Sequence, residues 1–165
     1  MALRDEVLHI VEPLRVSMEQ SVAAPLTDYL STGATADLYE LQGGMNRGQQ
    51  TLNRERFVSH VDGYLNGGNN LISVISIRAA NEKDVEVDML LRQFDRGVLQ
   101  RILNRAANQT NLLDEQIMVR KVISTFKFQR TGSEWTVTDV QWRSRLIDFN
   151  DEALWPRILS ALGRP

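Results

Sequence analysis

The chain has 165 residues, no cysteine and a formal net charge of −2. The lack of cysteine excludes disulfide frameworks, thiolate catalysis and cysteine-bound metals, and the charge does not favour a nucleic-acid-binding protein. Hydrophobic residues make up 42% and charged residues 24% of the chain, which is typical of a globular protein rather than a disordered one. We therefore expect a single domain over residues 1–165.

The start of the chain bears on its location. No run of 18 apolar residues occurs, and residues 1–5 lack the basic start that precedes the apolar core of a signal peptide. The sequence therefore predicts a cytoplasmic protein without a membrane span, unless a leader or an anchor has been removed.

Residues 1–24 are predicted to form a helical segment that packs on the sheet or on a partner. Apolar residues recur there at three- and four-residue steps, namely Leu3, Val7, Ile10, Val11, Leu14 and Met18. Pro13 interrupts this stripe, so we expect either a kinked helix or two short helices that meet near Glu12. Residues 25–52 suggest short helical pieces followed by a glycine-containing loop over 42–50.

A further helix is predicted to begin after Asn53, whose side chain can accept a hydrogen bond from a free backbone N–H. Leu52 and Phe57 occupy the two positions of a hydrophobic staple around this cap. Its buried face would consist of Phe57, Val61, Tyr64 and Leu65, and Asn66, Gly67 and Gly68 would end it.

The second half of the chain has the period of β-strands. Residues 71–77 are apolar on both faces, which predicts a central strand, and residues 85–91 alternate as in a strand with one buried face. A helix over 94–107 should follow, then a long hairpin and a short final helix. The apolar faces of the two hairpin strands coincide only if paired residue numbers sum to an even number. This requires an odd-length loop, most simply Thr131–Ser133.

This order of elements predicts an α+β fold, in which N-terminal helices precede a curved, mainly antiparallel sheet in two layers. The order over most of the chain resembles that of the cone-shaped NTF2-like domains and of some periplasmic domains of secretion systems. No shared motif accompanies the resemblance, so it transfers no functional residue. It implies a cone whose sheet and helices can enclose an apolar pocket with a few polar groups.

The sequence carries no recognisable catalytic constellation, and we expect neither a catalytic residue nor a cofactor. His9 and His60 are the only histidines, and no Gly-x-Ser-x-Gly elbow or phosphate-binding loop occurs. Glu86 and Asp88 share a strand face but lack a third acidic partner, so we expect no metal site. These observations lean against an enzyme without excluding one.

The leading hypothesis is a non-catalytic assembly subunit that self-associates or docks into a larger complex. It depends on a second apolar stripe on the odd-numbered face of the hairpin, which would be exposed if the helices cover only the even-numbered face. The predicted interface consists of Ile117, Val119, Ile123, Trp135, Val137, Arg143 and Arg145.

Two alternatives come from other classes of protein. In an NTF2-like cone that binds or converts a small molecule, the pocket residues would be His60, Tyr64, Asp139 and Trp142. In a protein that binds RNA or phosphate, an arginine-rich helix over 92–105 would supply Arg92, Arg96, Arg101 and Arg105. A nucleic-acid partner is the least expected, because the chain has no basic excess. An RNA-binding face would also need aromatic residues among these arginines, whereas Phe126 and Trp142 are assigned to the core face of the hairpin.

Overall fold

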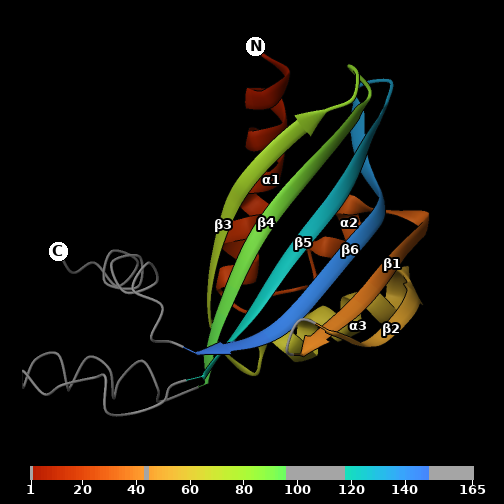
Figure 1. The fold of residues 1–165 in the computed structure, drawn as a ribbon. Coiled ribbons are helices and arrows are strands. Elements are labelled where there is room, and N and C mark those ends of the chain that lie inside the picture. The colour runs from red at the N-terminus through yellow and green to blue at the C-terminus, as the bar shows by residue number, and fades with distance from the viewer. Residues whose placement is uncertain (1, 43–44, 96–117, 149–165) are drawn as a thin grey trace, which may run out of the picture.

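The computed structural model describes residues 2–42, 45–95 and 118–148. In these ranges three helices cover one face of a strongly curved, six-stranded sheet (Figure 1). The predicted α+β class is confirmed. We call the face covered by the helices the inner face, and the opposite one the outer face.

The helices bury the residues that their periodicity indicates. The first, α1 (Leu3–Glu19), is one helix that contains Pro13, and it packs on the edge strand β3 (Gly68–Ala79). A single turn, α2 (Leu26–Tyr29), leads into the sheet. The predicted cap of α3 (Arg54–Leu65) is confirmed, since the backbone N–H of Arg56 donates to Asn53 Oδ1 at 2.9 Å.

Four antiparallel pairings and one parallel pairing join the six strands in the order β2-β1-β6-β5-β4-β3. Its remaining strands are β1 (Leu30–Gln42), β2 (Met45–Asn53), β4 (Asp84–Asp95), β5 (Met118–Thr131) and β6 (Glu134–Asp148). Only the pairing of β1 with β6 is parallel. Within the described ranges, no helix combines the length and apolarity needed to cross a membrane.

The prediction for residues 25–52 is wrong over most of its length, because residues 30–42 and 45–53 form strands rather than helical pieces and a loop. The inner face of β1 alternates Ala34, Ala36 and Leu38, all of them buried. Because the buried side chains of β1 are small, its sequence shows little difference in hydrophobicity between the two faces of the strand. The edge strand β2 buries Leu52 as its only described core residue and shows almost no pattern.

The long hairpin is confirmed, but its loop is shorter than predicted. Thr131 pairs with Glu134, so the loop has two residues rather than three. A register shift next to Lys127 leaves Thr138 unpaired, and from there on paired numbers sum to an even value, as in Phe126 and Val140. This β-bulge replaces the odd-length loop, because one extra residue in one strand changes the register by one.

Other predictions need correction at the ends of elements. The strand over 71–77 lies at the edge of the sheet rather than at its centre. Strand β4 continues to Asp95, where a helix was expected to begin, because Gln93 and Phe94 are both buried in the sheet. The predicted helix over 94–107 otherwise falls outside the described residues, as does the final helix.

Candidate functional site

A pocket of about 570 Å³ lies on the inner face, between α3 and the strands β1, β2, β5 and β6. Helix α3 contributes His60 and Tyr64 from successive turns. The strands contribute the side chains of Leu38, Glu40, Arg120, Trp142 and Ser144, among others. These five share the inner face by register, since Leu38 pairs with Trp142 and Glu40 with Ser144.

Trp142 forms the apolar floor of the pocket. Its side chain is only 1% exposed, and three aromatic rings of α3 meet it edge to face. The ring centroids of Phe57, His60 and Tyr64 lie 5.8, 6.4 and 5.7 Å from that of the indole. Edge-to-face pairs of this kind fix ring orientations, so the pocket is preformed.

Two polar atoms of this aromatic cluster lack a hydrogen-bond partner among the described residues. Both Tyr64 Oη and Trp142 Nε1 are buried without one. A buried polar group without a partner costs roughly 1–3 kcal/mol. Because both atoms belong to residues that line the pocket, a ligand with hydrogen-bond acceptors is the natural partner for them.

Burial also sets the protonation of the two titratable groups on α3. It raises the pKa of Tyr64 well above its usual value of 10, while the nearby Arg120 guanidinium opposes that shift. Partial burial of the His60 ring lowers its pKa below 6.5. At neutral pH the pocket therefore presents a neutral phenol and a neutral imidazole.

A buried amide network holds the carboxyl end of α3. Gln93 Nε2 donates to the carbonyl oxygen of Tyr64 and, at 2.9 Å, to Asn70 Oδ1. Asn70 Nδ2 donates to the carbonyl oxygen of Leu65 at 2.9 Å. Carbonyls at a helix end have no partner within the helix, so these side chains satisfy them and fix the position of Tyr64.

Glycine makes a close approach of β3 to β4 possible directly after α3. A Cβ atom on Gly68 would lie 2.0 Å from the carbonyl oxygen of Phe94. No side chain fits there, so the pairing of β3 with β4 at this point depends on the glycine.

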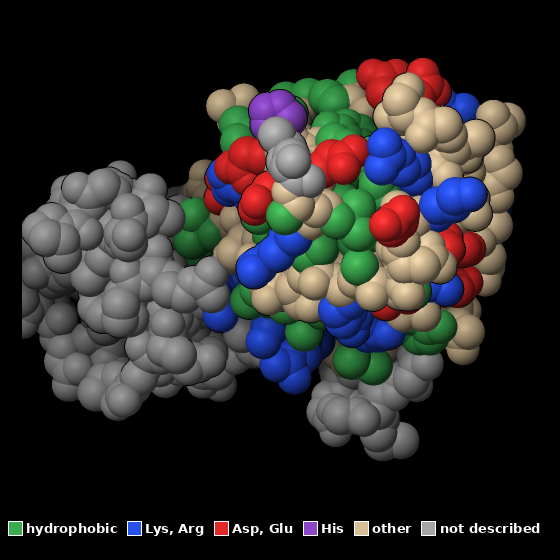
Figure 2. Space-filling view, turned by 90° about the horizontal axis from the view of Figure 1, so that it is seen from above, with side chains coloured by type: hydrophobic (Ala, Val, Ile, Leu, Met, Phe, Trp, Pro, Cys, Tyr) green, Lys and Arg blue, Asp and Glu red, His purple; other side chains and the backbone are tan. Residues whose placement is uncertain are grey.

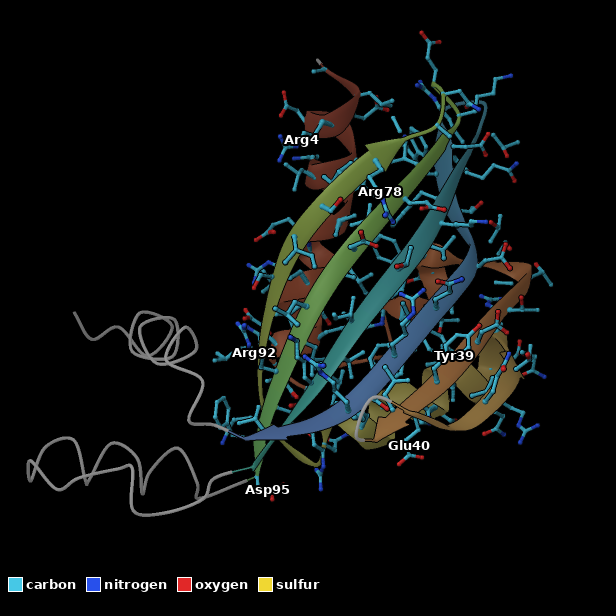
Figure 3. The ribbon with its side chains drawn as sticks, in the orientation of Figure 1. Arg4, Tyr39, Glu40, Arg78, Arg92 and Asp95 are labelled. Atoms are coloured by element: carbon cyan, nitrogen blue, oxygen red, sulfur yellow. The ribbon has the colours of Figure 1, made fainter. Side chains whose placement is uncertain are left out.

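The same network orients Arg120 at the pocket. Its Nη1 donates to Gln93 Oε1 at 3.1 Å and lies 3.3 Å from Asp95 Oδ1. The side chain remains 46% exposed, so guanidinium N–H groups stay accessible. Glu40 lies on the same face, where its Oε2 would be 3.9 Å from a Cβ on Gly48 (Figure 3).

Three of the four residues predicted for a pocket lie together here: His60, Tyr64 and Trp142. Asp139 does not join them. It lies on the outer face, where Thr35 Oγ1 donates to its Oδ1 at 3.0 Å. The alternation of β6 explains this, because residues an odd number apart lie on opposite faces of a regular strand.

Sequence reasoning missed Leu38, Glu40, Arg120 and Ser144. The first two were missed because β1 was not recognised as a strand. The signal for Arg120 was available, since it alternates with Val122 and Phe126 on the buried face of β5.

The residues predicted for an interface are divided between the two faces. Beyond the bulge at Thr138, Trp135 and Val137 lie on the inner face and are buried. Ile123 and Arg143 line a groove on the outer face, Arg145 lines the pocket, and Val119 is fully buried. Ile117 falls outside the described residues. Among the described side chains, the predicted interface residues therefore form no continuous exposed apolar stripe on one face.

The outer face carries a polar groove of about 490 Å³ instead. Arg78 bridges Glu86 and Asp88 at 2.9 and 3.0 Å, and Thr125 Oγ1 donates to Asp88 at 2.7 Å. An arginine thus occupies the space between the two carboxylates that were considered for a cation. Among the described residues, no group of three or more histidine, aspartate or glutamate side chains could hold a metal ion. From above, acidic and basic side chains are interspersed with apolar ones (Figure 2).

Of the four arginines predicted to bind an anion, only Arg92 lies within the described residues. Arg92 lies in β4 rather than on a helix, near the end of the strand marked by Asp95 (Figure 3). Arg96, Arg101 and Arg105 fall outside the described residues.

Comparisons with known proteins identify the fold. The sequence matches no protein-family model and no curated protein. Solved structures of similar fold include an NTF2-like protein of unknown function from Shewanella baltica OS155, with a TM-score of 0.57, 9% identity and coverage of 87% of this chain and 97% of that one. The chain therefore has the NTF2-like cone fold.

Two further similar structures are named as enzymes. A type 2 hexachlorocyclohexane dehydrochlorinase has a TM-score of 0.54 and 10% identity, with coverage of 90% of this chain and 89% of that one. A putative scytalone dehydratase from Novosphingobium aromaticivorans DSM 12444 has a TM-score of 0.52 and 7% identity, with coverage of 87% and 85%. At such identities the likeness concerns the fold alone.

Proposed function

We propose that this protein binds a small, largely apolar molecule in the pocket between α3 and the inner face of the sheet. The observation that carries the proposal is the pair of buried, unpartnered polar atoms at Tyr64 and Trp142. A site with aromatic walls and a few convergent polar groups is typical of small-molecule binding. The enzymes among the similar structures support the same class of function.

The assembly role suggested by the sequence loses its main support. It required an exposed apolar stripe, whereas Val119 and Val137 are buried within the chain and Ile123 is half-buried beside charged groups. Self-association remains a prediction for a hydrodynamic measurement to decide.

Catalysis in the pocket is a second candidate, favoured by one observation. His60 lies at the pocket with a pKa lowered by burial, so its neutral imidazole can accept a proton from a bound molecule at neutral pH. Replacing His60 by Gln should abolish turnover of any substrate found, while leaving binding in place.

A thermal-shift screen tests the binding proposal. Compounds with an apolar body and one acceptor group should raise the melting temperature of the protein, because a ligand that binds only the folded state stabilises it. The variant Ser144→Leu fills the pocket and should lose this response. Gln141→Leu, on the outer face of the same strand, should keep it. The proposal fails if no compound stabilises the protein, or if both variants respond alike.

A further inference from the structure

We propose that the ligand of this pocket is a small amphipathic monoanion, an aromatic or aliphatic carboxylate, whose carboxylate lies between the Tyr64 hydroxyl and the Arg120 guanidinium. This inference rests on the proposed function and adds the chemical class of the ligand. The pocket leaves two buried polar groups without a partner among the described residues.

Those unsatisfied groups are hydrogen-bond donors. The indole Nε1–H of Trp142 can only donate, and the Tyr64 hydroxyl carries a proton at all physiological pH values. An acceptor-only group such as a carboxylate can satisfy both kinds of donor, and its bonds are stronger because they are charge-assisted.

Arg120 supplies a positive charge next to these donors. Its field reaches the Tyr64 hydroxyl, since it opposes the rise in the phenol pKa that burial causes. Gln93 fixes the guanidinium through a bond from Nη1 at 3.1 Å, and the same Gln93 side chain bonds the Tyr64 carbonyl. One buried amide therefore sets the position of both ligand-binding groups.

The present partner of Arg120 leaves room for a ligand. Asp95 lies 3.3 Å away, but its side chain is 62% exposed and that of Arg120 is 46% exposed. Exposed ion pairs of this kind are weak, so a carboxylate bound in the pocket can share or replace Asp95.

Glu40 limits the ligand to one negative charge. It is exposed and lines the same pocket from β1. A second acidic group on the ligand would approach this carboxylate and be repelled. The body of the ligand instead meets apolar surface, provided by Leu38 and the ring of Trp142.

The test is calorimetric titration with trans-cinnamate and its neutral isostere cinnamamide. The wild-type protein should bind cinnamate about tenfold more tightly, the factor expected for a hydrogen bond to a charged group. Arg120→Gln should abolish this difference, and Arg120→Lys should retain most of it. The matched control Arg143→Gln removes an arginine from the outer face and should leave the difference unchanged.

The outcomes separate this inference from the proposal beneath it. If wild type binds both compounds equally, or if Arg120→Gln keeps the preference, the anionic class is refuted while the binding pocket stands. If neither cinnamate, cinnamamide nor any compound of the thermal-shift screen binds, both proposals are refuted.

Discussion

The rings of Tyr64 and Trp142 meet edge to face, with centroids 5.7 Å apart and planes at 85°, and each residue carries a buried polar atom without a partner. One residue comes from the last turn of α3 and the other from the middle of β6, 78 positions later in the chain by the difference of their numbers. The fold is thus less stable than it would be if both donors had partners, and the two donors remain free at one site. Such an arrangement is typical of a binding site rather than of a core.

The first prediction concerns Tyr64→Phe. Removing the unpartnered hydroxyl should raise the free energy of unfolding by about 1 kcal/mol. The variant no longer buries a polar group whose loss of hydration is not compensated by a hydrogen bond. The same change should weaken ligand binding. Urea denaturation and calorimetric titration measure the two effects.

Tyr29→Phe is the matched control. The Tyr29 hydroxyl donates to the carbonyl oxygen of Ile10 at 2.7 Å, so its removal should lower stability by about 1 kcal/mol. Effects of the same sign in both variants would show that the Tyr64 hydroxyl has a partner, contrary to the account.

The second prediction concerns the close approach of β3 to β4 at Gly68, directly after α3. Gly68→Ala should cost at least about 3 kcal/mol or prevent folding, since the new Cβ would lie 2.0 Å from a backbone oxygen. Gly63→Ala is the control within α3, where a Cβ meets no atom within 4 Å, and it should stabilise the protein by about 0.5–1 kcal/mol. A mild effect of Gly68→Ala in thermal denaturation would contradict the close approach described.

The third prediction concerns pH. The folded state holds the pKa of His60 below its unfolded value of 6.5. As the pH falls through 6.5, the unfolded chain therefore takes up more protons than the folded one, and stability should decrease. The His60→Gln variant should lack this component. Proton NMR titration of the imidazole measures its pKa directly, and a value at or above 6.5 would refute the assignment.

The fourth prediction concerns the exposed edge of the sheet at β3. The backbone N–H of Ile72 donates to Glu19 Oε1 at 2.9 Å, and Arg15 Nη1 donates to the Ile72 carbonyl at 3.1 Å. These side chains of α1 supply the bonds that a further strand would supply. An unpaired edge favours association with other chains.

The double variant Arg15→Ala, Glu19→Ala should therefore lose about 1–3 kcal/mol of stability and associate at high concentration. Glu12→Ala serves as the control, because Glu12 bonds Arg15 without touching the edge. Analytical ultracentrifugation across a concentration series measures association. Equal behaviour of the double variant and the control would show that the edge is protected in another way.

Sequence periodicity predicted the elements whose buried faces carry large side chains. Asn53 and Phe57 marked the start of α3, and the alternation of Val85, Val87 and Met89 marked β4. β1 was missed because Ala34 and Ala36 bury little apolar surface. A residue in a sheet is recognised from the sequence by the size of the side chain it buries, and this strand buries small ones.

The hairpin shows a second limit of sequence reasoning. The pattern required an even register sum, which a three-residue loop or a bulge can both provide. The structure has the bulge at Thr138, and this bulge places Trp135 and Val137 on the inner face. A bulge involves one residue without a distinctive side chain, so hydrophobic patterning cannot locate it. The interface hypothesis assumed a regular strand without this register shift, so the shift alone removes Trp135 and Val137 from the predicted stripe.

The pocket was partly predictable for the same reasons. His60, Tyr64 and Trp142 were found because α3 and β6 were assigned correctly. Arg120 acquires its role only through Gln93 and Tyr64, which are brought to it by the pairing of β4 with β5 and by the docking of α3. Such a contact depends on tertiary structure and leaves no local trace in the sequence.

The most direct test of the binding account is to follow the indole N–H resonances of ¹⁵N-labelled protein during titration with cinnamate, with the resonances assigned from Trp→Phe variants. Trp135 Nε1 already donates to Glu6 Oε1 at 3.1 Å, so its resonance serves as an internal reference. The Trp142 resonance should shift as the ligand contacts the indole, while the Trp135 resonance stays in place. Binding of cinnamate with no change at Trp142 would contradict the account.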